Sequence, residues 1–375
     1  MRRDISIIGY ARSEKRTFAE RPLCHADLLV MSMLSFLRFE RIGQGEVLWA
    51  EGPEGIALSA LNERVMLSDL AQDVLSEPKV RELAAAASVS KRFGELELLD
   101  FSARRDLEAP VAFAACAFGV PARDGRTIVI AFRGTEEEQE CWQEDFECAV
   151  CTEIPSEREA IAFFNRCAHA HPGSRFVLTG FSKGGSLAER VVLFGEDAAV
   201  ARIDEVVNFD GNGLFRLGSA DCPEFVDFDA DLSARYASCS VPLVKYLTPA
   251  FVGLILEQRD EVQLRVLRGA EGAFGHDPFF PEISRGDFST RSLEPEERKR
   301  ATLLNRWVKQ LSLEERHAVI DVLFALDSES TKRFILDDWH ALVDVAASTL
   351  RGMGSTSSQS RRLFFQAIAK FPGSR

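Results

Sequence analysis

The sequence predicts an α/β protein in which a mainly parallel central sheet is joined to a helical N-terminal region and a helical C-terminal appendage. From about residue 95 to about residue 290, short apolar runs alternate with segments of helical periodicity. Such apolar runs are typical of strands that are covered on both faces of a sheet. Helices between such strands make crossover connections, and crossover connections produce a parallel sheet. The two ends of the chain are instead mainly helical in character.

We expect residues 1–90 to form a mainly helical region that packs on the core. Asp27 is expected to cap an amphipathic helix over 28–37, because apolar residues recur there at steps of three and four. A second helix is expected over 80–87, shortly after Pro78.

Residues 91–290 are expected to form the α/β core. Its helices are predicted over 157–168 and 186–194, where apolar residues again follow helical spacing. The strands are predicted over residues 111–120, 127–132, 176–179, 206–209, 243–247 and 262–267.

Residues 291–375 are expected to form a C-terminal helical region. A charged run over 294–300 predicts a solvated helix start, and helical patterns follow over 303–311, 319–326 and 334–345. The Gly- and Ser-rich segment 352–360 predicts a flexible link to a last helix over 363–371.

The composition argues against several classes of function. A formal net charge of −13, from 45 Lys and Arg against 58 Asp and Glu, disfavours binding to nucleic acid or to anionic lipid surfaces. No apolar stretch reaches the roughly 20 residues of a membrane span, and no signal peptide follows Met1. We therefore expect a cytoplasmic protein whose eight cysteines stay reduced, with Cys148 and Cys151 as buried hydrophobic residues rather than metal ligands.

One motif carries chemistry. The strand at 176–179 runs directly into Gly180-Phe181-Ser182-Lys183-Gly184, and a helix follows. A G-x-S-x-G sequence between a strand and a helix is typical of the nucleophile elbow of α/β-hydrolases, where a tight turn lifts the serine hydroxyl clear of the sheet. The turn also puts the amide of Lys183 at a helix N-terminus, where it can donate to an oxyanion. This context predicts an α/β-hydrolase fold with Ser182 as nucleophile; the alternative is a glycine-rich turn without chemistry.

A serine nucleophile needs a base, which in this fold comes last along the chain. Three of the six histidines follow Ser182. His317 and His340 lie within helical patterns, whereas His276 lies in a loop after the strand at 262–267. We therefore predict that His276 is the base.

The acid that orients the base should lie between the serine and the histidine. Asp210 directly follows the strand at 206–209, and catalytic groups in parallel sheets collect at the carboxyl ends of strands. Glu257 and Asp260 are the alternatives, but they precede a strand. Asp210 is therefore predicted to be the acid.

A second oxyanion donor is expected in the loop after the strand at 127–132. Arg133-Gly134-Thr135 follows that strand; Gly134 permits a sharp turn, and Thr135 offers an amide and a hydroxyl. Trp142 and Asp145 come next, at a spacing that suits a helix face closing over the loop.

These motifs together resemble the class 3 lipase branch of the α/β-hydrolases. The likeness rests on Ala131-Phe132-Arg133-Gly134-Thr135, on Trp142 and Asp145, and on the run from Gly180 to Ala188. The sequence is more similar still to a bacterial family of lipase-like proteins of unassigned function, whose motifs are G-H-S-K-G-G-N-L-A, N-F-D-G-P-G and Q-H-D. Asn208-Phe209-Asp210-Gly211-Asn212-Gly213 and Gly275-His276-Asp277-Pro278 stand at the corresponding places. Asp27 with its helix, and Arg92-Phe93, look similar to that family's N-terminal region, so the resemblance covers most of the chain.

The sequence also departs from these families. Phe181 replaces the usual histidine before the nucleophile and Ser186 replaces an asparagine, and neither residue is expected to touch the triad. Class 3 lipases take their acid from the strand after the one that ends at Asp210. In this sequence residues 247–253 hold no acid, which leaves Asp210 in that role.

The predicted function is hydrolysis of carboxylic esters, with acyl lipids among the candidate substrates, through an acyl-enzyme on Ser182. Neither a cofactor nor a metal is predicted: the glycines at 211 and 213 lack the third glycine of a dinucleotide fingerprint, and the acidic run 227–231 lacks the glycine and glutamate of a calcium loop. The expected partner is a small-molecule ester or lipid, while acyl chain length, ester against amide preference and oligomeric state stay open. The alternative is a catalytically inactive hydrolase-fold protein that binds partners, with the C-terminal helices as docking surface.

Overall fold

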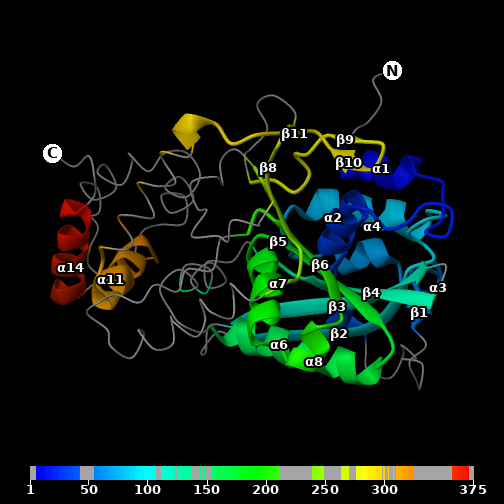
Figure 1. Ribbon diagram of the computed structural model, residues 1–375, viewed down its shortest axis with the longest axis horizontal. Coiled ribbons are helices and arrows are strands. Elements are labelled where there is room, and N and C mark those ends of the chain that lie inside the picture. Colours follow the sequence, from blue (N-terminus) through cyan, green and yellow to red (C-terminus); the bar gives the residue numbers. More distant parts are fainter. Residues whose placement is uncertain are drawn as a thin grey trace.

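In the residues that it describes, the computed structural model contains a nine-stranded sheet with helices on both of its faces (Figure 1). The strand order across the sheet is β1-β2-β3-β4-β5-β6-β7-β8-β11. The structure describes residues 6–42, 55–106, 111–122, 125–136, 144, 147, 154–211, 239–248, 263–269, 276–297, 299, 303, 307, 310–324 and 357–370.

Five parallel strands form the centre of the sheet. Each of them overlaps an apolar run of the sequence, as expected for strands covered on both faces. They are β4 (Gly125–Phe132), β5 (Arg175–Phe181), β6 (Ile203–Phe209), β7 (Leu243–Leu247) and β8 (Gln263–Leu267). The mainly parallel sheet with flanking helices that was expected of an α/β-hydrolase fold is thereby confirmed.

Antiparallel strands extend the sheet on both sides. On the β4 side lie β3 (Val111–Ala122), β2 (Glu97–Asp106) and β1 (Ile56–Ala57), and on the β8 side lies β11 (Thr290–Arg291). A separate ribbon pairs β9 (Ile283–Ser284) with β10 (Asp287–Phe288). The sequence did not indicate β2, because its second half is exposed and carries charged residues instead of an apolar run.

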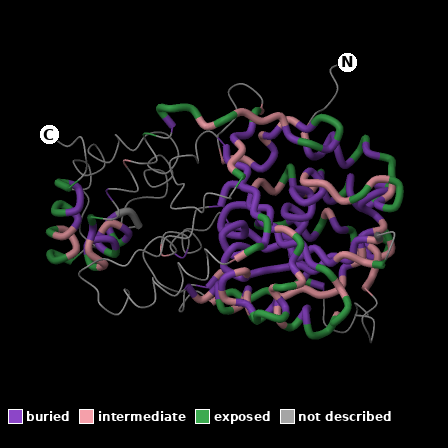
Figure 2. Tube along the Cα trace, in the orientation of Figure 1, coloured by how far each residue is buried: buried purple, intermediate pink, exposed green. Residues whose placement is uncertain are grey.

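Helices bury both faces of the sheet (Figure 2). Along β4, Val129 and Ala131 pack with the N-terminal helices, whereas Ile128 and Ile130 pack with the helices that follow β4 and β5. The first group comprises α1 (Ile7–Ser13), α2 (His25–Leu34), α3 (Leu58–Arg64) and α4 (Glu77–Ser88), with the short 3-10 helices η1 (Phe39–Arg41) and η2 (Leu67–Leu70). The second group comprises α6 (Pro155–Ala170), α7 (Lys183–Phe194) and α8 (Asp197–Val200).

A fully buried ion pair joins α2 to the segment after α4. The helix starts at His25, so Asp27 is its third residue and not the cap that the sequence suggested; its carboxylate accepts the backbone N–H of Cys24 at 2.9 Å. The guanidinium of Arg92 donates to both carboxylate oxygens of Asp27, at 2.7 and 2.6 Å, and neither side chain is exposed. Tyr10 donates to Asp27 at 2.8 Å, and burial together with the neighbouring Asp27 raises the pKa of Tyr10, which keeps the phenol a neutral donor.

We expect Arg92→Met to lower the free energy of unfolding by about 3–5 kcal/mol, because it leaves the Asp27 carboxylate buried without its counter-charge. Urea unfolding followed by far-UV circular dichroism measures this loss. The control is Arg81→Met: Arg81 pairs with Glu77 at the surface, and such pairs contribute no more than about 1 kcal/mol. Equal stability losses in the two variants would contradict this account.

Near the C-terminus, α11 (Leu313–Phe324) packs against α14 (Ser358–Ala369) at the end of the molecule away from β1 (Figure 1). Their shared cluster contains Trp307 and Phe364. Residues 358–360 belong to α14 and not to a flexible link, because the Ser357 hydroxyl accepts the backbone N–H of Ser360 at 3.0 Å and starts the helix there. The helix predicted over 334–345 lies outside the described residues.

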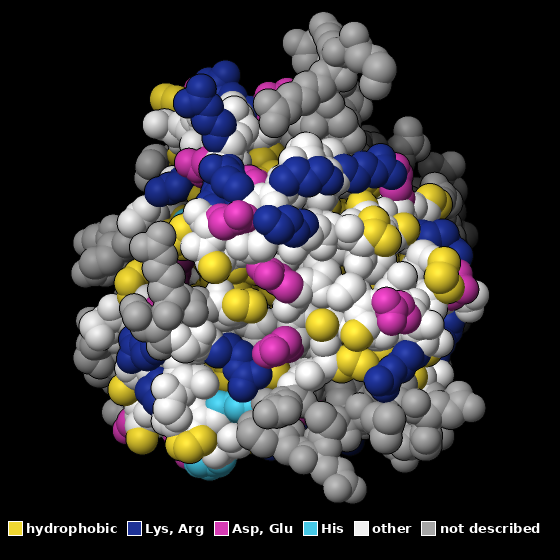
Figure 3. Space-filling view, turned by 90° about the vertical axis from the view of Figure 1, so that its right-hand side faces the viewer, with side chains coloured by type: hydrophobic (Ala, Val, Ile, Leu, Met, Phe, Trp, Pro, Cys, Tyr) yellow, Lys and Arg dark blue, Asp and Glu magenta, His cyan; other side chains and the backbone are white. Residues whose placement is uncertain are grey.

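Basic and acidic side chains are mixed on the face shown in Figure 3, with hydrophobic side chains scattered between them. Within the described part of the chain, no helix combines the length and the apolar character that crossing a membrane demands.

Candidate active site

Ser182 stands on the tight turn that joins β5 to α7. Its φ of 57° and ψ of −131° are unusual for a residue with a side chain, and its backbone N–H donates to the carbonyl of Phe209 on β6 at 2.8 Å. The turn also needs glycine, since a β-carbon on Gly180 would lie only 2.2 Å from the carbonyl carbon of Gly184. The strand, turn and helix thus have the strained geometry of a nucleophile elbow.

A chain of two hydrogen bonds links Ser182, His276 and Asp210. Ser182 Oγ lies 3.1 Å from His276 Nε2, and His276 Nδ1 lies 2.9 Å from Asp210 Oδ2. An ionised carboxylate can only accept hydrogen bonds, so Nδ1 carries the proton and Nε2 is left to accept the serine hydroxyl. Ser182 and Asp210 are buried, with only 1% of the Asp210 side chain exposed, and 8% of the His276 side chain is exposed.

The structure brings these three residues together from distant parts of the sequence. Asp210 follows β6 directly, in a left-handed turn with a φ of 59°. His317 lies exposed on α11, whereas Glu257, Asp260 and His340 lie outside the described residues.

Phe181 contacts the histidine, so the expectation that this residue is remote from the triad was wrong. Its ring stacks on the His276 imidazole with centroids 4.9 Å apart and an interplanar angle of 25°. The turn that carries His276 is also fastened to α4, because Asp277 accepts a hydrogen bond from Lys79 at 2.6 Å. An aromatic face thus lies against the imidazole, and an ion pair to α4 holds the turn that carries it.

The loop after β4 lies directly against the nucleophile turn. A β-carbon on Gly134 would lie 2.4 Å from the carbonyl oxygen of Phe181 and 3.3 Å from the β-carbon of Ser182. Thr135, the next residue, is buried. The predicted second oxyanion donor therefore belongs to a loop in contact with Ser182.

Charged side chains hold this loop on both sides of Gly134 and Thr135. Arg133 donates from Nε to the carbonyl of Ser35 at 2.7 Å and from Nη1 to Glu136 at 3.0 Å. Arg38 donates to the other oxygen of Glu136 at 2.9 Å. Burial opposes ionisation of Glu136, but the two guanidiniums outweigh it and hold the pKa of that carboxyl below its usual range.

Lys183, whose amide is the other predicted oxyanion donor, sends its side chain into a buried ion pair. Its Nζ lies 2.7 Å from Glu144 Oε2 and 2.9 Å from the carbonyl of Ala112, and neither charged side chain is exposed. Glu144 also accepts the N–H and the hydroxyl of Ser156, at 2.8 and 2.7 Å. Burial alone would raise the pKa of Glu144, yet Lys183 and Ser156 lower it overall.

Sequence reasoning missed Glu144. It singled out Trp142 and Asp145, which lie outside the described residues, as do Cys148 and Cys151. The available signal was the lysine inside the elbow motif, since a buried ammonium needs a carboxylate partner.

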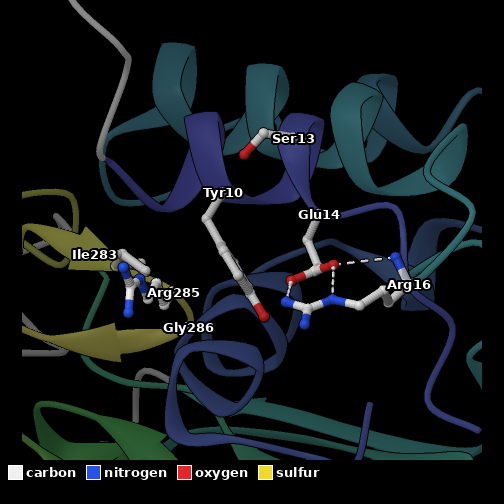
Figure 4. A pocket seen from close by; sticks show the side chains of 7 residues that line it. All are labelled: Tyr10, Ser13, Glu14, Arg16, Ile283, Arg285 and Gly286. Carbon is white, nitrogen blue, oxygen red and sulfur yellow. Dashed lines mark hydrogen bonds and ion pairs between the residues drawn. The ribbon is translucent and has the colours of Figure 1, made fainter. Parts of the chain in front are cut away.

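A pocket of about 200 Å³ lies between α1 and the β9–β10 ribbon, and its lining residues do not include Ser182, His276 or Asp210. Figure 4 shows the Glu14 carboxylate on its wall, paired with Arg16. Arg21 also donates to Glu14, at 2.7 Å, so this carboxylate is held by its neighbours. Among the residues that the structure describes, no three His, Cys, Asp or Glu side chains are grouped as a metal site requires.

Comparisons with known proteins match the chain to a family model and to solved structures. A crystal structure titled M37 lipase matches with a TM-score of 0.30 and 15% identity, over 60% of this chain and 68% of the lipase chain. At that level of similarity nothing about function is transferred from it. No curated protein matches the chain. The model of the Mbeg1-like family matches residues 87–325, well over half of the sequence, and the chain belongs to that family.

Proposed function

We propose that the protein is a serine hydrolase that cleaves carboxylic esters, with acyl lipids among its candidate substrates. The observation that carries this proposal is the hydrogen-bonded chain from Ser182 Oγ through His276 to Asp210, with links of 3.1 and 2.9 Å. These distances are those at which a general base takes a proton from a serine and an acid orients the base. The elbow backbone of Ser182 supports the same reading.

In the proposed mechanism, Ser182 Oγ attacks the ester carbonyl while its proton passes to His276 Nε2. Asp210 holds the Nδ1–H and stabilises the imidazolium that forms. The tetrahedral intermediate then collapses, and the bond between its carbon and the alkoxide oxygen breaks. His276 protonates the alkoxide, which leaves as an alcohol, and the acyl group stays on Ser182 Oγ. A water molecule, deprotonated by His276, hydrolyses this acyl-enzyme and restores the serine.

Two backbone amides are proposed to bind the negative charge that develops on the carbonyl oxygen. The amide of Lys183 begins α7, where the helix dipole favours an anion. The amide of Thr135 comes from the loop that lies against Ser182. Since the ion pairs of Lys183 and of Arg133 fix both segments before the substrate arrives, little reorganisation is needed during the reaction.

Hydrolysis of p-nitrophenyl esters of increasing acyl length tests the proposal and defines the acyl preference. We expect turnover by the wild-type protein and none above background by Ser182→Ala. A rate maximum at short or at long chains would distinguish an esterase from a lipase-like enzyme. Absence of turnover across the whole series, with the protein folded, would favour the inactive, partner-binding alternative.

We expect Thr135→Ala to lower kcat far less than loss of a triad residue does. The substitution keeps the amide and removes only the hydroxyl, and a single side-chain donor is worth at most roughly 10²–10³ in kcat. Thr135→Ser retains the hydroxyl and serves as control in the same kinetic assay. A loss in Thr135→Ala as large as that in Ser182→Ala would show that Thr135 is misassigned.

A further inference from the structure

Thr248, the first residue after β7, donates two hydrogen bonds to the Asp210 carboxylate. Its backbone N–H lies 2.6 Å from Oδ1, and its hydroxyl Oγ1 lies 2.5 Å from Oδ2. Thr248 is itself buried, with 1% of its surface exposed. Because an ionised carboxylate cannot donate, the hydroxyl proton of Thr248 points at Asp210.

The carboxylate of Asp210 depends on few donors. In the described part of the chain its hydrogen-bond partners are Thr248 and His276, with no lysine or arginine beside them. A buried carboxylate that lacks hydrogen-bond donors is strongly destabilised. In the described residues, the Thr248 hydroxyl is therefore one of three groups that hydrogen-bond this carboxylate, with the Thr248 N–H and His276 Nδ1.

The hydroxyl acts on the oxygen that matters for the histidine. Oδ2 accepts from both Thr248 Oγ1 and His276 Nδ1, while Oδ1 accepts from the Thr248 amide. The carboxylate is thus held at both oxygens, and its rotation away from the imidazole would break at least one bond to Thr248. The hydroxyl bond fixes the direction in which Oδ2 faces Nδ1.

Other contacts already hold the backbone of Asp210. Its N–H donates to the carbonyl of Tyr246 on β7 at 2.7 Å. The next amide, that of Gly211, donates to Asn208 Oδ1 at 2.7 Å, and Asn208 Nδ2 in turn donates to Glu189 at 2.6 Å. The turn therefore has its own supports, which leaves orientation of the carboxylate as the specific task of the Thr248 hydroxyl.

We propose that Thr248 is a positioning residue of the triad: its hydroxyl orients the Asp210 carboxylate toward His276 and stabilises its charge while the imidazolium forms. This inference rests on the proposed serine-hydrolase function. It extends the site to the end of a second strand, β7, which holds no acidic residue of its own.

Thr248→Val tests the proposal, because valine keeps the shape and the backbone N–H and removes only the hydroxyl. A hydrogen bond to a charged group is worth enough to lower kcat by about 10–100-fold when it is lost. KM should change by less than about threefold, since Thr248 contacts the acid and not the substrate. Thr248→Ser restores a hydroxyl and should recover most of the lost rate. If the valine variant does not fold, the pair Thr248→Ala and Thr248→Ser makes the same comparison.

The matched control is Thr179→Val on β5. Thr179 is also a buried threonine, and its hydroxyl bonds the carbonyl of Val207 at 2.9 Å, away from the acid. We expect this variant to lose stability but to keep kcat within about threefold. If kcat falls as much in Thr179→Val as in Thr248→Val, the loss comes from altered packing of a buried threonine and not from the hydrogen bond to Asp210. That result would overturn the proposal.

A double-mutant cycle with Asp210→Asn separates orientation of the acid from any independent role. The readout is the rate at which a fluorophosphonate labels Ser182. Thr248→Val should lower this rate little further once Asp210 is replaced by asparagine. Additive losses, or an unchanged rate in Thr248→Val alone, would overturn the inference while the hydrolase function stands. If wild-type protein neither turns over esters nor labels, the proposed function fails and this inference fails with it.

Discussion

Replacement of Ser182 or of His276 by alanine is expected to lower kcat/KM for ester hydrolysis by at least ~10⁴, because the members of a triad act as a unit. Ser182→Ala removes the attacking oxygen, and His276→Ala removes the base 3.1 Å from it. Steady-state kinetics on a p-nitrophenyl ester of the preferred chain length measures both losses. The double variant should be hardly slower than either single variant.

Two controls keep this result specific. Circular dichroism and urea unfolding should show that both variants are folded, since Ser182→Ala deletes a single oxygen. His317→Ala replaces an exposed histidine on α11 and should leave the rate unchanged. Undiminished hydrolysis in purified Ser182→Ala or His276→Ala would refute the assignment of these residues.

Asp210→Asn is expected to lower kcat by ~10⁴ with little change in structure. The amide oxygen can keep the hydrogen bond from the Thr248 backbone N–H, but the NH₂ group that replaces Oδ2 would donate toward His276 Nδ1 and favour the tautomer that cannot accept the serine proton. Steady-state kinetics would show the loss in kcat, with KM close to that of the wild type.

Asp204→Asn is the matched control, because Asp204 lies on the same strand and pairs with Arg175 at the surface. It should be as active as the wild type. If an Asp210→Asn variant retains most of the wild-type kcat, Asp210 has only a structural role in the turn after β6, and another group orients the histidine.

The central strands could be predicted because burial on both faces leaves a local trace in the sequence. Residues 127–132 and 243–247 are almost wholly apolar, and both are strands. The antiparallel strands at the edge of the sheet could not be predicted in the same way. The strand β2 is partly exposed and carries charged residues. It is held in the sheet by pairing with β3, and the amino-acid composition of β2 does not reveal that pairing.

The candidate triad could be located because each member has a local signature: an elbow motif, an aspartate at a strand end and a histidine in a loop. The contacts around it have no such signature. Glu144 reaches Lys183 across 39 residues, and Thr248 reaches Asp210 across 38. Such partners are set by the order of strands in the sheet, and the sequence shows that order only indirectly.

Asp27 and Arg92 illustrate the intermediate case. The resemblance to the lipase-like family marks both residues, yet neither spacing nor composition pairs them. The structure joins them across 65 residues in one buried ion pair. A charged residue in an apolar segment thus predicts that a partner exists without showing where it lies.

The most direct test of the central claim is to treat the folded protein with a fluorophosphonate and map the adduct by peptide mass spectrometry. An activated serine reacts with such a probe, whereas an ordinary serine hydroxyl is too weak a nucleophile. We predict one adduct, on the peptide that contains Ser182, its absence in Ser182→Ala, and much slower labelling in His276→Ala. A folded wild-type protein that gains no adduct at Ser182 would contradict the account.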